Sequence, residues 1–251
     1  MKYIKFFENY KEVDNFKLLS EIILKTFLKE YRMSFKRFQK TLNYSEFKGV
    51  SLYGDMLDID ILKNDRNTNL YSFLRSKFFR DLEIKLILPQ DNSEGSYNTN
   101  RNILNISTYY MDEVIKDEDI FSNEFLIKLY NKFSHIIIHE LTHIYDFYML
   151  DGNLFTSKDL KRHKKRITNL NNIDNILTAD NDYYNSSFEI KSHLNEIIFE
   201  LGDISVYKTF QDLLDKINSI ERLNSFYNNL ETKNKQKINK ILFKLWSSQK
   251  E

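Results

Sequence analysis

The sequence predicts an α+β fold that is predominantly helical, with a small β-sheet and helical additions at both ends of the chain. Only 5 of the 251 residues are Gly and 1 is Pro. Few positions therefore force a turn, which favours long helices. Apolar residues recur every three or four positions in several long segments, as on one face of a helix. Convincing alternation of apolar and polar residues, the pattern of a strand, is confined to residues 82–107.

The N-terminal third predicts two helices. Residues 14–42 carry a stripe of aromatic and aliphatic side chains at helical spacing and predict one long helix, with a break at Met33-Ser34 as an alternative. Residues 68–80 predict the second helix. The intervening residues 43–66 are ambiguous, and a third strand could come from 50–62.

The strand signal follows these helices. Residues 82–88 alternate between apolar and polar types and stop at Pro89, which cannot continue a strand ladder. A polar loop is expected over 90–100, and residues 103–107 predict a second strand. Two strands alone are marginally stable, so we expect them to pack on helices.

A central helix is predicted over residues 122–150, with Ser122 as its N-cap. Residues 153–182 are polar and contain the basic run 158–166, which predicts a solvated loop or a short helix, with a patch that touches an acidic substrate or partner as the alternative. Another helix is predicted over 186–200. Two or three amphipathic helices should follow from Asp203 onward.

These segments suggest three regions. They are a helical N-terminal region (1–80), a core (81–202) and C-terminal helices (203–251), with a single domain as the alternative.

Composition excludes several classes of protein. Lys and Arg number 37, and Asp and Glu number 36, which gives a formal net charge of +1. The chain therefore has no global field that would attract nucleic acid. The absence of cysteine excludes thiolate metal ligands and disulfides and fits a reducing cytoplasm.

We expect a cytoplasmic protein with no membrane span. The first residues lack the apolar segment of a signal peptide. No run approaches the roughly 18 apolar residues of a membrane helix. The high content of Lys, Asn, Ile, Phe and Tyr is typical of a low-GC genome, bacterial or phage, and a phage protein would act in the host cytoplasm or the virion.

The most informative motif lies in the predicted central helix. It reads His139-Glu140-Leu141-Thr142-His143. Two histidines four apart on a helix share one face, so both imidazoles can bind one zinc ion at about 2.0–2.1 Å. Glu140 is then placed to take a proton from a water bound to the metal.

Neither a chance match nor a structural role of the two histidines is as good an explanation of this motif as a metal site. With residue types drawn independently, the pattern arises in roughly one chain in a hundred of this length. The alternative is a pair of surface histidines without a metal. Apolar residues at 138, 141 and 144 favour instead a buried helix whose polar edge faces a cleft. His135, one turn earlier, is expected to pack or to face substrate rather than bind metal.

A catalytic zinc needs three protein ligands and one open position. The third ligand should come from another element. Candidates downstream are His163, Glu189, His193, Glu196 and Glu200. His163 sits among like charges in the basic run, which disfavours it. The other four share one face of the predicted helix 186–200.

The pattern of a His-Glu-x-x-His helix followed by a second helix that supplies Glu resembles the gluzincin branch of the zincin metallopeptidases. The segment from Tyr183 to His193 also resembles the Tyr-then-Glu arrangement of the anthrax-lethal-factor type and of phage and bacterial metallopeptidases. The resemblance covers about residues 82–200. It implies a zincin-like core with an active-site helix, Glu189 as third ligand of Zn2+, and Tyr183 or Tyr184 as hydrogen-bond donor to the oxyanion.

One position departs from that family. Many gluzincins have Asp four residues after the ligand Glu, where this chain has His193. Three alternatives follow. His193 contacts a metal ligand rather than the metal, or His193 is itself a ligand, or Asp146 is the group that orients a zinc histidine. Asp146 shares the face of His139 and His143, and ligand histidines usually donate their second N–H to a carboxylate.

These residues predict a zinc metallopeptidase that hydrolyses peptide bonds in a peptide or protein substrate. The strand at 103–107 is expected to be the sheet edge that binds an extended peptide. The rival class is a non-catalytic zincin-fold protein, for example a virion or regulatory component. A peptidase-like toxin would share the chemistry and differ in its substrate.

Overall fold

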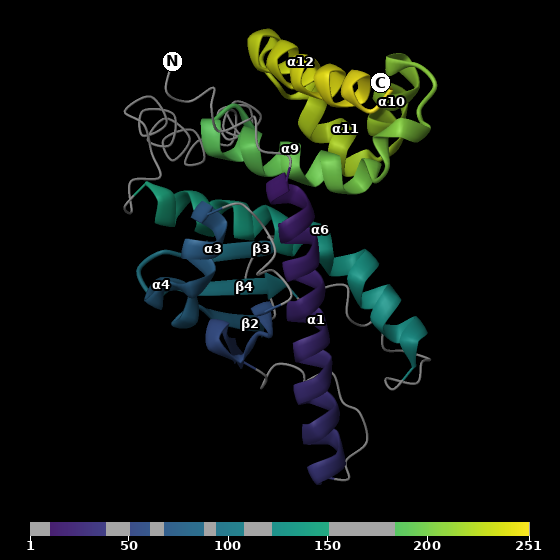
Figure 1. The fold of residues 1–251 in the computed structure, drawn as a ribbon. Helices are drawn as coiled ribbons and strands as arrows, with labels where there is room; N and C mark the ends of the chain where they lie inside the picture. Colours follow the sequence, from purple (N-terminus) through teal and green to yellow (C-terminus); the bar gives the residue numbers. More distant parts are fainter. Residues whose placement is uncertain are drawn as a thin grey trace, which may run out of the picture. The chain divides into compact units, whose positions relative to one another are not determined.

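The computed structural model describes residues 11–38, 51–60, 68–87, 94–107, 122–150 and 184–250. They are mostly helical with one four-stranded sheet, which confirms the predicted fold class (Figure 1). The chain forms two compact units. One comprises Lys11–Tyr148 and the other the described residues from Met149 onward. None of the helices in these ranges has the length and apolar character needed to cross a bilayer.

The sheet belongs to the first unit. Its strands are β1 (Ser51–Tyr53), β2 (Glu83–Ile87), β3 (Gly95–Asn98) and β4 (Ile103–Ser107), in the order β1-β2-β4-β3. Strands β2 and β4 pair in parallel, and both outer strands pair antiparallel to their neighbours. The predicted strands at 82–88 and 103–107 and the third strand within 50–62 are thus confirmed.

Strand β3 was not predicted, because it falls within the expected loop at 90–100. The prediction that residues 103–107 form the sheet edge is therefore wrong. Strand β4 lies between β2 and β3, and in the described sheet β1 and β3 are the two edge strands. The sequence of β3, Gly-Ser-Tyr-Asn, has no apolar alternation, so its pairing with β4 is decided by tertiary context rather than by pattern.

Helix α1 (Lys11–Phe38) is one uninterrupted helix through Met33 and Ser34, so the alternative of a break there is not realised. The part of its predicted stripe from Phe16 to Phe27 is buried. The predicted helix over 68–80 is two helices, α3 (Thr68–Arg75) and α4 (Lys77–Arg80). Ser76 separates them, because its Oγ accepts the Phe79 N–H at 3.1 Å and starts α4.

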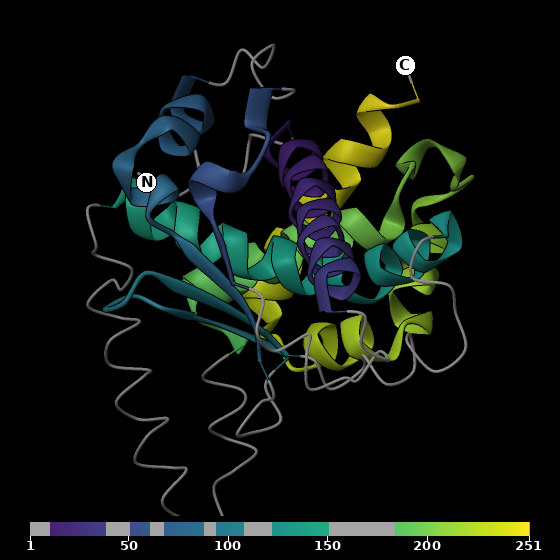
Figure 2. The same cartoon turned by 90° about the horizontal axis from the view of Figure 1, so that it is seen from below.

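Helix α6 (Asn123–Met149) is the predicted central helix, and it crosses the sheet (Figures 1 and 2). Its predicted cap is confirmed, since the Phe125 N–H donates to Ser122 Oγ at 3.1 Å. The Tyr145 ring packs against Phe16 of α1 and Phe73 of α3, with ring centroids 5.8 and 5.3 Å apart. The α1 and α3 helices thereby fix α6 in the core of this unit.

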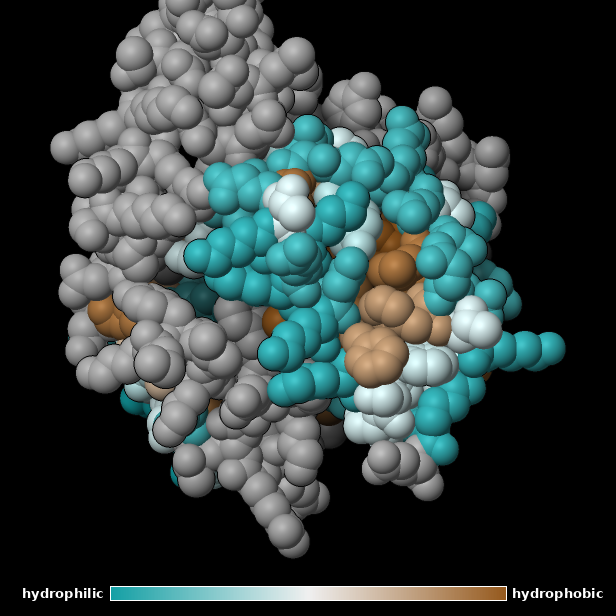
Figure 3. Space-filling view, turned by 90° about the horizontal axis from the view of Figure 1, so that it is seen from above, coloured by the Kyte–Doolittle hydropathy of each residue, from teal (hydrophilic) through white to brown (hydrophobic). Residues whose placement is uncertain are grey.

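The second unit is helical in its described part. It contains α9 (Ser187–Leu201), the short 3-10 helix η5 (Ile204–Val206), α10 (Phe210–Ser219), α11 (Glu221–Asn228) and α12 (Thr232–Ser248). The predicted helix at 186–200 and three amphipathic helices after Asp203 are confirmed. Their apolar faces form one core. Most of the coloured residues in Figure 3 are hydrophilic, with one small apolar area among them. Val206 and Phe243 are exposed apolar side chains of this unit.

Candidate metal centre

The two motif histidines approach each other closely on α6. Their Nε2 atoms are 3.1 Å apart, and the ring planes lie at 82° with centroids 4.7 Å apart. Two nitrogens bound at about 2.05 Å to one tetrahedral ion would lie about 3.3 Å apart. The pair therefore already has the separation that a shared zinc ion requires, although the same distance permits a hydrogen bond between the rings.

Helix α6 is buried around the motif. Ile138, Leu141 and Ile144 are fully enclosed, as predicted from their spacing. Glu140 and Asp146 keep only 7% of their surface, and His143 only 9%. The motif histidines therefore share their helix with two carboxylates that are almost completely buried.

The edge strand comes close to Glu140. A Cβ atom added at Gly95, the first residue of β3, would lie 3.0 Å from Glu140 Cγ and 3.2 Å from its Oε1. It would also lie 2.7 Å from Ile136 Cγ2. Only glycine fits at this distance without displacing a neighbour. The backbone at the start of β3 therefore lies directly beside the Glu140 side chain.

His135 makes a second link between α6 and the segment that precedes β3. Its Nε2 lies 3.6 Å from Glu94 Oε2, and its side chain is mostly covered. This position fits the expectation of a packing or substrate-side residue. The His135–Glu94 contact helps to hold the start of β3 close to α6.

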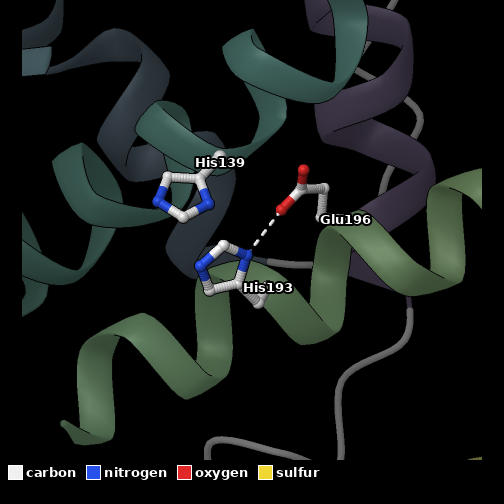
Figure 4. Close-up of side chains that lie close together, drawn as sticks. All are labelled: His139, His193 and Glu196. Carbon is white, nitrogen blue, oxygen red and sulfur yellow. Dashed lines mark hydrogen bonds and ion pairs between the residues drawn. The ribbon is translucent and has the colours of Figure 1, made fainter. Parts of the chain in front are cut away.

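The predicted polar face of α9 is also formed. Its Glu189, His193 and Glu196 side chains are covered. His193 Nδ1 lies 2.7 Å from Glu196 Oε2, as Figure 4 shows, and His193 Nε2 lies 3.8 Å from Glu189 Oε2. Glu196 and Glu200 both pair with Arg222 of α11, and the second contact is 3.0 Å long.

Sequence reasoning missed Arg222 and Phe226. Phe226 stacks on the His193 ring with centroids 4.2 Å apart. Both residues lie on α11, more than 20 positions beyond α9, and no local pattern marks them. Tyr184 packs in the same aromatic group, 5.7 Å from the His193 ring. Tyr183 and His163 lie outside the described residues.

Two tyrosines of the first unit are kept neutral by burial. Burial raises the pKa of Tyr97, on β3, well above its ordinary value. Burial, helped by the charge of Glu21, raises the pKa of Tyr130, on α6, to about 12. Both phenols therefore stay protonated at neutral pH, and Tyr97 donates to Asn102 Oδ1 at 2.9 Å.

Among the described residues, two groups of side chains could hold a metal ion. One is His139, His143 and Glu189, and the other is His139, His193 and Glu196. No family model matches the chain. Neither a curated protein nor a solved structure shows significant similarity to it. The case for a function therefore depends on the chemistry of these residues.

Proposed function

We propose that this protein is a zinc-dependent metallopeptidase, with His139 and His143 as two ligands and Glu189 as the third. The observation that carries the proposal is the separation of the two Nε2 atoms, 3.1 Å, against about 3.3 Å for two nitrogens on one tetrahedral zinc. A buried glutamate follows the first histidine directly. A structural zinc would need no such carboxylate and would tend to close its fourth position with a protein ligand.

The choice of Glu189 depends on what surrounds the other donors of α9. The alternative ligand set is His139 with His193 and Glu196. Glu196 already pairs with Arg222 and His193, which weakens it as a metal ligand. His193 lies between the carboxylates of Glu189 and Glu196, so each of its ring nitrogens already lies beside a carboxylate oxygen.

The residues of this chain then have separate roles. Bound zinc supplies Lewis acidity and lowers the pKa of a water towards 7. Glu140 takes a proton from the attacking water and passes it to the leaving amine. Tyr183 or Tyr184 donates a hydrogen bond to the oxyanion, an interaction worth about 2.7–4 kcal/mol in acyl transfer.

The substrate of the proposed reaction is an extended peptide. Within the described residues, β3 pairs only with β4, so its other side can accept a peptide strand by backbone hydrogen bonds. Its first residue lies against the carboxylate assigned as the base. A peptide added to β3 would therefore pass beside Glu140.

The test is a comparison of wild type with Glu140→Gln. Zinc content and cleavage of a mixed fluorogenic peptide library are measured, with a chelator control. We expect wild type to bind one zinc and to lose activity with the chelator. Glu140→Gln should keep the zinc and lose about 10²–10⁴-fold in rate, the usual contribution of general acid–base catalysis.

Glu124→Gln is the matched control, because Glu124 lies exposed in the first turn of the same helix. It should behave like wild type. Full turnover by zinc-loaded Glu140→Gln would eliminate Glu140 as the base. Zinc uptake without cleavage by wild type would favour a non-catalytic zincin-like protein.

A further inference from the structure

We infer that Arg222 on α11 is a positioning residue of the proposed metal centre, acting through Glu196 and His193 on the ligand Glu189. The inference rests on the proposed function, because it assigns a role at the same site. All of its contacts lie within the second unit. It makes the C-terminal helices part of the reaction machinery rather than an addition to it.

The His193 ring is fixed on its edge and on its face. Its Nδ1 lies 2.7 Å from Glu196 Oε2. Its face stacks on the Phe226 ring, with centroids 4.2 Å apart and planes at 28°. A ring held in both ways cannot turn about its bond to the chain. Its remaining nitrogen, Nε2, is thereby directed towards Glu189 Oε2, 3.8 Å away.

Glu196 can hold His193 only if its own charge is compensated. Its side chain keeps 4% of its surface, and a buried carboxylate needs a cation or strong donors. Arg222 provides the cation through Nη1 on Glu196 Oε1, which leaves Oε2 for His193. The other arm of the guanidinium, Nη2, donates to Glu200 Oε1 at 3.0 Å.

The chemistry of arginine explains why this position suits it. A planar guanidinium has donors in a fixed fork and can serve two carboxylates at once. Glu196 and Glu200 lie one turn apart on α9, so one fork can span both. Lysine would bring the charge as a single point and could not hold both carboxylates in one geometry.

These contacts together hold the His193 ring beside the Glu189 carboxylate. Groups that hydrogen-bond or pair with metal ligands fix their orientation, and their loss typically costs 10–100-fold in metal affinity. Removal of Arg222 would leave Glu196 buried without its cation. Glu196 would then shift or take up a proton, and His193 would lose its anchor.

The experiment compares zinc affinity in the full-length chain, measured by competition with a chromophoric chelator. We expect Arg222→Met to weaken zinc binding about 10–100-fold. Arg222→Lys should recover part of the loss, because it restores charge without the fork. Glu221→Gln is the matched control, since Glu221 is the exposed neighbour of Arg222 on α11, and it should bind zinc like wild type.

Two further readouts separate positioning from general stability. In a His193→Ala background, Arg222→Met should weaken zinc binding no further, because Arg222 acts through His193. With Co2+ in place of zinc, the visible absorption bands should change in Arg222→Met and stay unchanged in Glu221→Gln. X-ray absorption of wild type should count two imidazole ligands.

Several results would overturn the inference. Folded Arg222→Met with wild-type zinc affinity would do so while leaving the proposed function intact. Three imidazoles on the metal would do so as well. If Arg222→Met does not fold, Glu196→Gln takes its place, with the same expected loss and the same meaning if affinity is unchanged. A wild-type protein that takes up no zinc would overturn the proposed function, and the inference with it.

Discussion

At Gly95, a missing side chain lets the edge strand approach the proposed base. A Cβ here would meet Ile136 Cγ2 at 2.7 Å and Glu140 Cγ at 3.0 Å. Contacts below 3.0 Å require a neighbour to move. Ile136 is buried in α6 and cannot yield easily, so β3 would have to move away from α6. The Glu140 side chain, 3.0–3.2 Å from the added atom, would also have to shift by a few tenths of an ångström.

We predict that Gly95→Ala lowers peptide hydrolysis without removing zinc. Overpacking costs about 1–3 kcal/mol. Each 1.4 kcal/mol that it adds to the activation free energy lowers the rate about tenfold. Zinc content and kcat/KM are measured together. Ser96→Ala, at the next and exposed position, is the control and should keep full activity. Wild-type kcat/KM in Gly95→Ala would show that β3 does not limit the position of Glu140.

The sequence alone identified the motif residues but not Gly95 or Arg222. The motif at 139–143 is contiguous, and the helical period alone brings its histidines together. Gly95 and Arg222 act through contacts with residues more than 20 positions away. No local pattern encodes such contacts, so neither residue could be assigned a role before the fold was known.

At the scale of elements, Asn185 ties the start of α9 to the connection between α11 and α12. Its side chain is buried. Its Nδ2 donates to the Asn229 carbonyl at 3.0 Å. Its Oδ1 accepts from the Glu231 N–H at 2.7 Å and from Asn234 Nδ2 at 2.9 Å. The buried Asn185 side chain thus bonds with one buried residue, Asn234, and with the backbone of two less buried ones, Asn229 and Glu231.

We predict that Asn185→Ala destabilises the second unit by about 2–5 kcal/mol, because each buried polar group left unsatisfied costs about 1–3 kcal/mol. Urea unfolding followed by the fluorescence of Trp246, the single tryptophan, measures this. Asn228→Ala removes only an exposed hydrogen bond with Asn224 and should change stability by less than about 0.5 kcal/mol. Equal effects of the two substitutions would contradict the bridging role of Asn185.

Long periodic elements were the predictable ones. Helices α1, α6, α9 and α12 each carry several turns of apolar spacing, and packing of that face decides their conformation. Strand β3 carries no such signal. The prediction of one helix over 68–80 missed the break between α3 and α4, where the Ser76 hydroxyl caps the next helix.

At the scale of the whole molecule, the proposed ligands are distant in the sequence. His139 and His143 lie on α6, and Glu189 lies on α9. All three fall within the predicted core of 81–202, which no local pattern divides. Helix α9 shares its apolar core with α10, α11 and α12. If Glu189 is a ligand as proposed, zinc binding stabilises these C-terminal helices as well.

We therefore predict that zinc removal destabilises the C-terminal helices. Trp246 lies on α12 and packs against the core that α12 shares with α9, so its fluorescence follows the unfolding of these helices. Free zinc at 100 times its Kd stabilises a folded state by about 2.7 kcal/mol. The Trp246 unfolding midpoint of wild type should rise with zinc and fall with chelator. In Glu189→Gln, which removes the proposed third ligand, most of the rise should disappear. An undiminished rise would mean that Glu189 does not bind the zinc.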